Sequence, residues 1–330
     1  MIIDVPVVLL VSIALAYTFL NGIHDSSNIV ATMISSRAMG PRKALMLTAV
    51  AEFMGPFLLG VAVAKAIGSE IVVQEMVDYY SILAGTVAAI LWNLFTWATG
   101  IPSSSSHALI GGLIGAVMMV YGRDAIIVSG LWKVIGGLFL APPAGLIGGY
   151  IVMKIILFLA RGASPKINIL FKRGQLITSF GLALSHGAND AQKAVAIIIM
   201  GMMTLGRFES FYVPRWTILL CATGLAVGTA VGGWRIIRTI GGRFYKIRPI
   251  HGFTTQITSA GIIALASVVG SPVSTTQVVS SSILGIGSAQ RISQVRWKVA
   301  QEIMIAWLLT IPITGGLAAL LRFALPYLWR

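Results

Sequence analysis

Two acidic residues stand in stretches of this sequence that are otherwise apolar. Asp25 lies in the segment NGIHDSSN (21–28) and Asp190 lies in HGANDAQK (186–193), and the two segments align residue for residue. A charged side chain at the centre of a bilayer costs at least ~2.5–3.5 kcal/mol on insertion scales, so such a residue indicates a function. Neither segment contains an arginine. Each carboxylate is therefore predicted either to cap a half-helix or to bind a cation.

Hydroxyl side chains gather in two further segments, GIPSSSSH (100–107) and GSPVSTTQ (270–277). In each segment a proline ends one helical stretch and Ser or Thr residues begin the next. The first N–H groups of a helix have no partner within it and carry partial positive charge, so two such ends form an anion site. The predicted anion ligands are Ser104, Ser105, Ser106, Ser274, Thr275 and Thr276.

The aspartates attract a cation, whereas the helix N-termini attract an anion. Two carboxylates repel an anion unless a cation is bound beside them. Oxygen ligands suit a hard cation such as Na⁺, and a proton on the aspartates is the alternative. Either way the cation and the anion need each other, which predicts cotransport. The predicted Na⁺ ligands are Asp25, Asn28, Asn189, Asp190, Ser105 and Thr276.

A possible accessory cation site involves residues without an identical counterpart in the other half of the chain. Glu52 and Glu302 lie in predicted spans and could be cation ligands, proton carriers or partners of a lysine. Lys193 stands where the first acidic segment has Asn28. Lys193 could therefore be a fixed partner of Asp190 or a substitute for one cation. The candidate residues are Glu52, Gln192, Lys193 and Glu302, and no transition metal is expected.

The composition places these segments in a membrane protein. Hydrophobic residues make up 57% of the 330 residues and charged residues 10%, where a soluble domain carries roughly 25% charged residues. Apolar segments of about 20 residues, each long enough to span a bilayer, recur throughout. We expect an all-α polytopic protein in the plasma membrane, surrounded by lipid. The net charge of +14 lies mostly in short loops, as the positive-inside rule requires, so nucleic acid is not an expected partner.

The basic loops predict which side of the membrane each span faces. Excess Lys and Arg assign four loops to the cytoplasm: 35–43, 161–173, 238–248 and 291–298. The acidic loop 65–80 and both termini then lie outside. Residues 80–120 start and end outside, and residues 251–288 start and end inside. Each of these stretches breaks near its middle at a hydroxyl segment, which predicts two helical hairpins inserted from opposite sides.

Four blocks of sequence recur in the same order in the two halves of the chain. The acidic segments and the hydroxyl segments are two of them. Residues 41–68 match 214–241 at one constant offset, and LWKV (131–134) matches RWKV (296–299). Because the first copy starts outside and the second inside, the halves are predicted to be inverted repeats, which are typical of secondary transporters.

The repeats are predicted to be residues 1–160 and 175–330, joined by a basic cytoplasmic linker at 161–174. Each is expected to contain a hairpin and a broken helix, the break lying beside the glycine of its acidic segment, Gly22 or Gly187.

The acidic segments resemble the two signatures of the inorganic phosphate transporter (PiT) family. NGIHDSSNIVATMISSRAMG is similar to the first bacterial signature and SHGANDAQKAVAIIIM to the second, and the hydroxyl segments also resemble those of the family. The resemblance covers the whole chain. It implies a homodimeric transporter that imports phosphate by symport with Na⁺ or H⁺. Asp25 and Asp190 would then adjoin phosphate as well as the cation. The family also contains sulfate permeases.

Other classes of function fit the residues less well. An intramembrane hydrolase could use Asp25 and Asp190 as an acid and base pair. However, no arginine lies in the acidic or hydroxyl segments to hold a phosphoryl group, and no Gly-x-Gly-Asp motif is present. A passive anion channel would not need the two acids. No cofactor is expected, and Na⁺ serves as the coupling ion for alternating access at a site between the repeats.

Overall fold

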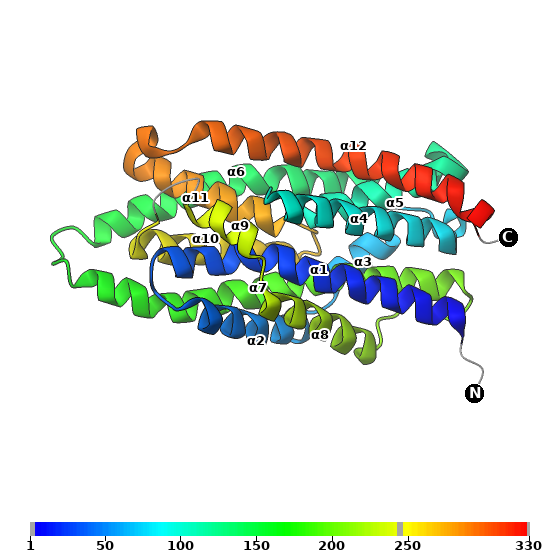
Figure 1. The fold of residues 1–330 in the computed structure, drawn as a ribbon, viewed down its shortest axis with the longest axis horizontal. Helices are drawn as coiled ribbons and strands as arrows, with labels where there is room; N and C mark the ends of the chain where they lie inside the picture. The colour runs from blue at the N-terminus through cyan, green and yellow to red at the C-terminus, as the bar shows by residue number, and fades with distance from the viewer. Residues whose placement is uncertain (1–3, 243–246, 329–330) are drawn as a thin grey trace.

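The computed structural model describes residues 4–242 and 247–328, and the regular elements in these ranges are helices (Figure 1). The long helices are α1 (Val5–Ser35), α2 (Pro41–Leu59), α3 (Ala62–Ser69), α4 (Tyr79–Thr99), α5 (Ser105–Tyr121), α6 (Val128–Leu159), α7 (Ile167–Thr204), α8 (Arg215–Val231), α9 (Trp234–Gly242), α10 (Pro249–Val268), α11 (Thr275–Arg291) and α12 (Trp297–Leu328). Three 3₁₀ turns are η1 (Gln74–Met76), η2 (Arg123–Ala125) and η3 (Ile292–Gln294). The prediction of an all-helical fold is confirmed.

Several of the helices are long and apolar enough to cross a bilayer. Within the described ranges four do so alone, and two bent pairs, α2 with α3 and α8 with α9, raise the number to six. Helix α7 is not among them, because its middle carries the polar HGANDAQK segment, which is buried inside the bundle. The predicted polytopic membrane protein is therefore confirmed.

The bundle is elongated, and the start of α1 and the end of α12 lie at the same end of it (Figure 1). The turn between α6 and α7 lies at the opposite end. Helices α4 and α5 extend from the end with the termini, and α10 and α11 from the other end. The two tips meet, since the Ser106 hydroxyl donates to the carbonyl of Val273 at 3.0 Å. The two predicted hairpins are thus present and point toward each other.

The predicted helix breaks beside Gly22 and Gly187 are wrong, because α1 and α7 run through them without interruption. These glycines instead mark two close helix crossings. A Cβ atom on Gly187 would lie 2.1 Å from the carbonyl oxygen of Glu52 on α2, and one on Gly22 would lie 2.2 Å from that of Leu225 on α8. Glu52 and Leu225 correspond at the repeat offset. A residue without a side chain is needed at each crossing.

The helix breaks lie elsewhere, at corresponding points of the two halves. The pair α2 and α3 bends by 75° near Gly60, and the pair α8 and α9 by 73° near Gly233. Gln192 on α7 donates to the carbonyl of Gly60 at 2.7 Å, and Ser27 on α1 donates to that of Gly233 at 3.0 Å. A break inside a membrane requires such partners for its freed backbone groups.

These equivalent crossings and breaks support a two-repeat organisation, with residues 1–160 and 175–330 joined by 161–174. The inverted orientation of the repeats stays a prediction. So does the side of the membrane that each loop faces. Part of the third basic loop, residues 243–246, lies outside the described residues.

We expect Gly187→Ala to destabilise the protein, because the new methyl group would overlap the backbone of α2. Overpacking of this kind costs about 1–3 kcal/mol. The measurement is the thermal unfolding midpoint of the detergent-purified protein. Gly181→Ala on the same helix is the matched control, since no neighbouring atom lies within 4 Å of its Cβ position. Equal midpoints for the two variants would contradict the proposed role of the crossing.

The predicted orientation can be tested with single cysteines at the two ends of the bundle. Ala163, between α6 and α7, and Ser210, between α7 and α8, are both exposed, whereas the native Cys221 is buried. A membrane-impermeant maleimide should label Ser210→Cys in intact cells, and Ala163→Cys only after the membrane is permeabilised. The reverse pattern would invert the predicted topology.

Candidate functional site

Asp25 lies at the centre of the bundle, where both hairpin tips reach it. Its Oδ2 accepts a hydrogen bond from Ser105 at 2.8 Å, and its Oδ1 accepts one from Thr276 at 3.0 Å. Oδ1 also lies 2.9 Å from His24 Nδ1 and 3.4 Å from Asn28 Nδ2. Among the described residues, no lysine or arginine pairs with this carboxylate, which is fully buried. Among the described residues, the direct contact of Asp25 that can carry a positive charge is His24.

Asp190 occupies the equivalent place on α7, but its surroundings differ. Its Oδ1 lies 2.9 Å from the ammonium nitrogen of Lys193, one turn along the helix. Its Oδ2 accepts from Asn21 Nδ2 at 3.0 Å. Lys193 also donates to the Ser105 hydroxyl at 3.2 Å, and that hydroxyl in turn donates to Asp25. The two aspartates are therefore joined through Lys193 and Ser105.

A third buried carboxylate extends this network toward α2 and α8. Glu52 lies 2.8 Å from His186 Nδ1, and His186 Nε2 lies 3.5 Å from Asp190 Oδ2. The Thr229 hydroxyl donates to the other oxygen of Glu52. All four side chains are buried. Glu52 thus belongs to this buried network, and its partner is a histidine and not a lysine.

Sequence reasoning missed His186, Asn21 and Tyr17. His186 and Asn21 occupy the first position of the two acidic segments, four residues before each aspartate and hence on the same helix face. That spacing could have identified them. Tyr17 lies one further turn back and donates to the carbonyl of Ser105 at 3.2 Å. His24, next to Asp25 in the chain, also hydrogen-bonds within the site.

The hairpin tips present two helix N-termini to this cluster. Ser104 and Ser274 cap α5 and α11, accepting from the backbone N–H groups of His107 and Gln277. Their hydroxyl groups therefore stabilise the helix ends. The hydroxyl of Thr275 is buried and has no hydrogen-bond partner among the described residues. Thr275 is the tip hydroxyl that is free for a ligand.

Three predicted site residues lie outside the cluster. Asn189 donates to Ser267 on α10 at 3.2 Å, and not to either aspartate. Gln192 holds the helix break at Gly60, accepting from the N–H of Ala64 as well as donating. Glu302 is exposed on the outer face of α12, so its assignment to a buried accessory site is corrected. Nothing in the sequence distinguished the face of α12 that Glu302 occupies.

The cluster has the chemistry of a site for a hard cation. The amide oxygens of Asn21 and Asn28 are buried without partners among the described residues. Ligand atoms of Asp25, His186 and Asp190 all lie within 4.8 Å of one another. Unused carboxylate and amide oxygens are the donors that Na⁺ or a similar cation takes from a protein.

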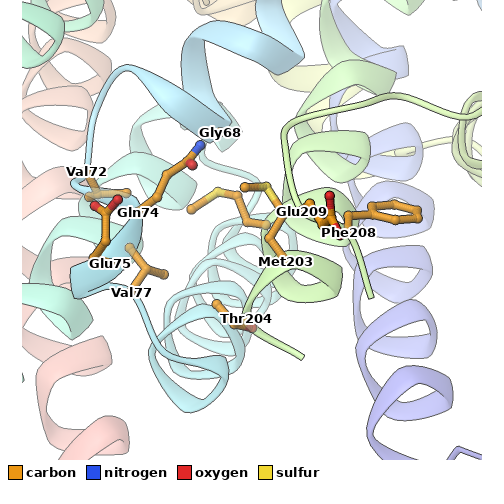
Figure 2. A pocket seen from close by; sticks show the side chains of 10 residues that line it. Gly68, Val72, Gln74, Glu75, Val77, Met203, Thr204, Phe208 and Glu209 are labelled. Atoms are coloured by element: carbon orange, nitrogen blue, oxygen red, sulfur yellow. The ribbon is translucent and has the colours of Figure 1, made fainter. Parts of the chain in front are cut away.

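Two cavities of the bundle lie outside this cluster. One, of about 190 Å³, lies between α7 and η1, with the carboxylates of Glu75 and Glu209 on its sides and Met203 between them (Figure 2). The other, of about 690 Å³, is an apolar groove between α6 and α12 whose lining includes His107 and Gln277. Neither is lined by Asp25, Asp190 or Lys193. Since these three residues are also fully buried, the site is closed in this arrangement.

Similar proteins are known over the whole length of the chain. A protein of Bacillus subtilis (strain 168), named "Probable low-affinity inorganic phosphate transporter", is 42% identical over 322 residues, which is 96% of each chain. One of the same name from Rhizobium meliloti (strain 1021) is 38% identical, covering 96% of this chain and 95% of that one. A solved structure named "The sodium-dependent phosphate transporter" shares the fold with a TM-score of 0.90 at 22% identity, covering 98% and 99% of the two chains.

These relatives are transporters and not enzymes, which removes the hydrolase interpretation. With its apolar helices, the chain is a multi-pass protein of the plasma membrane. Residues 21–318 match the sequence profile of the family described as "Phosphate transporter family". Since this match takes in both acidic segments and both hairpin tips, the chain belongs to the phosphate transporter family.

Proposed function

We propose that this protein imports inorganic phosphate by symport with Na⁺, using the buried cluster as an alternating-access site. The observation that carries the proposal is the environment of Asp25. Its carboxylate is fully buried and contacts hydroxyl, amide and imidazole groups, with no lysine or arginine paired to it in the described chain. Such a carboxylate requires a mobile cation, and the name of the structural neighbour supports Na⁺.

The hairpin tips would hold the anion next to that cation. The N-termini of α5 and α11 offer backbone N–H groups and the free hydroxyl of Thr275. Two like charges 4 Å apart repel by ~4 kcal/mol at an effective dielectric of 20. Bound Na⁺ offsets this repulsion between Asp25 and the anion, so each ion strengthens the binding of the other.

Phosphate suits the cluster better than sulfate for a chemical reason. Near neutral pH, phosphate keeps at least one proton that it can donate, whereas sulfate has none. Asp25 and Asp190 accept hydrogen bonds, and they would gain one from phosphate only. The names of the relatives support the same anion.

Transport from a closed site requires the bundle to open alternately at its two ends. The hairpins extend from opposite ends, and the bends at Gly60 and Gly233 lie beside the helices that carry the aspartates. We propose that one repeat moves against the other about these points. A homodimer, and contact with membrane lipid, also stay predictions.

Proton coupling is the second candidate. The close pairs of Asp25 with His24 and of Glu52 with His186 favour it, since a proton could neutralise either pair. A proton bound at Asp25 would replace Na⁺ without altering the anion site.

Radiolabelled phosphate uptake into proteoliposomes tests these alternatives. An imposed Na⁺ gradient should drive accumulation, an imposed pH gradient without Na⁺ should not, and excess sulfate should compete weakly. Accumulation driven by the pH gradient alone would refute Na⁺ coupling. Accumulation of sulfate in place of phosphate would refute the anion assignment.

In the same assay, Asp25→Asn should abolish Na⁺-driven accumulation, because the amide removes the charge that attracts the cation while keeping the shape of the side chain. Glu302→Gln is the matched control. It removes a carboxylate from an exposed helix face and should leave uptake unchanged. Normal Na⁺-driven uptake by Asp25→Asn would show that the cation binds elsewhere.

Thr275→Val should raise the KM for phosphate by about tenfold or more, since a hydrogen bond to a charged group contributes ~1.5–3 kcal/mol. The Na⁺ concentration for half-maximal uptake at saturating phosphate should change little. Thr223→Val is the control, because Thr223 is exposed and its hydroxyl donates to the carbonyl of Leu219 on its own helix. An unchanged KM would remove Thr275 from the anion site.

A further inference from the structure

Asn28 and Lys193 make similar bridges in the two halves of the protein, although the tip hydroxyls that they reach, Thr276 and Ser105, are not at aligned positions. Asn28 hydrogen-bonds Asp25 of its own helix at 3.4 Å and Thr276 of the opposite hairpin tip at 2.8 Å. Lys193 contacts Asp190 of its own helix at 2.9 Å and Ser105 of the opposite tip at 3.2 Å. The two residues occupy the same place in the aligned acidic segments. Each therefore joins an aspartate of one repeat to a tip hydroxyl of the other.

The two bridges differ in charge. The Asn28 amide is neutral, and it leaves Asp25 without a fixed lysine or arginine partner in the described chain. The Lys193 ammonium sits between a carboxylate and a hydroxyl oxygen, both of which are ligands that a bound Na⁺ would take. Lys193 is 0% exposed and is among the largest fully buried side chains. A buried ammonium of this kind is stable only if it is paired, and here its partner is Asp190.

We propose that the Lys193 ammonium fills the position of a second cation, so that each transported phosphate is accompanied by a single Na⁺, bound at Asp25. This inference rests on the proposed Na⁺ symport and concerns its stoichiometry. Lys193 is tethered to α7, so it neutralises Asp190 throughout the cycle without being transported. The cycle consequently moves one positive charge fewer than two mobile cations would move.

The neighbouring charged and titratable groups agree with this assignment. Asp190 faces Lys193 and also His186, and His186 is paired with Glu52 on α2. Asp25 lies beyond Ser105, on the other side of that hydroxyl. Asp190 is paired with Lys193, whereas Glu52 and Asp25 each contact a histidine. Of the two aspartates, Asp25 is the one without a lysine partner in the described chain.

The test is the ratio of ²²Na⁺ to ³²P-phosphate taken up by proteoliposomes, together with the Na⁺ dependence of uptake. For the unaltered chain we expect a ratio near one and a Hill coefficient of about 1. Lys193→Asn restores the residue of the other repeat and opens the second position. Its ratio should approach two, and its Hill coefficient should rise to about 2.

Lys193→Met is the matched control, because it removes the charge without supplying an oxygen ligand. Na⁺-driven uptake by this variant should fall at least tenfold with no rise in the Hill coefficient. Equilibrium binding of ²²Na⁺ to each purified, folded variant gives a readout that does not depend on transport. The expected binding is one Na⁺ for the unaltered chain and two for Lys193→Asn.

The outcomes separate this inference from the proposed function. A ratio near two for the unaltered chain would overturn the inference and leave Na⁺ symport intact, whether or not Lys193→Asn folds. A raised KM for phosphate in Lys193→Asn with an unchanged ratio would also overturn it, since Lys193 would then be an anion ligand. Phosphate uptake by the unaltered chain that ignores Na⁺ would overturn both proposals.

Discussion

The structure depends on keeping three carboxylates, Asp25, Glu52 and Asp190, out of water in the middle of a membrane protein. Removing an ion from water costs several kcal/mol, and that cost is offset only by charge partners and hydrogen bonds. Asp190 meets this requirement with Lys193, and Glu52 contacts His186 and Thr229. Asp25 meets it only in part, through hydroxyl, amide and imidazole contacts. The incomplete compensation at Asp25 is the physical basis of the proposed cation coupling.

Two helix crossings allow the carboxylates to be brought together. Where α1 passes α8 and α7 passes α2, glycines let the backbones approach so closely that a Cβ atom would overlap a carbonyl oxygen. The same two helices then support the broken helices of the opposite half, through Ser27 and Gln192. Because α1 and α7 remain continuous, the aspartates are held on rigid helices. The backbone instead departs from helical geometry at the hairpin tips and at the two bends.

The near-equivalence of the two halves makes their differences informative. In the alignment of the two halves, Asn28 corresponds to Lys193, Asn21 to His186 and Leu225 to Glu52. Lys193 and His186 contact Asp190 directly, whereas the direct contacts of Asp25 are His24 and neutral side chains. Duplication thus supplied two similar sites, and substitution gave one of them fixed charge partners. The remaining site is the one in which a mobile ion would be held.

The sequence by itself determined the helical membrane class, the repeated segments and most of the residues that meet at the site. The composition indicates the helical membrane class, and the constant offsets between the copies identify the repeated segments. Asp25, Asp190, Ser105 and Thr276 could be named because polar residues are costly in an apolar span and stand out there. The same reasoning placed the helix breaks wrongly, since a glycine in a sequence does not reveal whether it serves flexibility or close packing.

Only the tertiary structure decided which residues contact one another across the two halves. Gln192 and Glu302 both belonged to the predicted accessory site, yet one holds a helix break and the other is exposed on α12. His186 became part of the site through a contact with Glu52, which is 134 residues away in the chain. Such contacts depend on which face of each helix turns inward, and that follows from the packing of the whole bundle and not from local spacing.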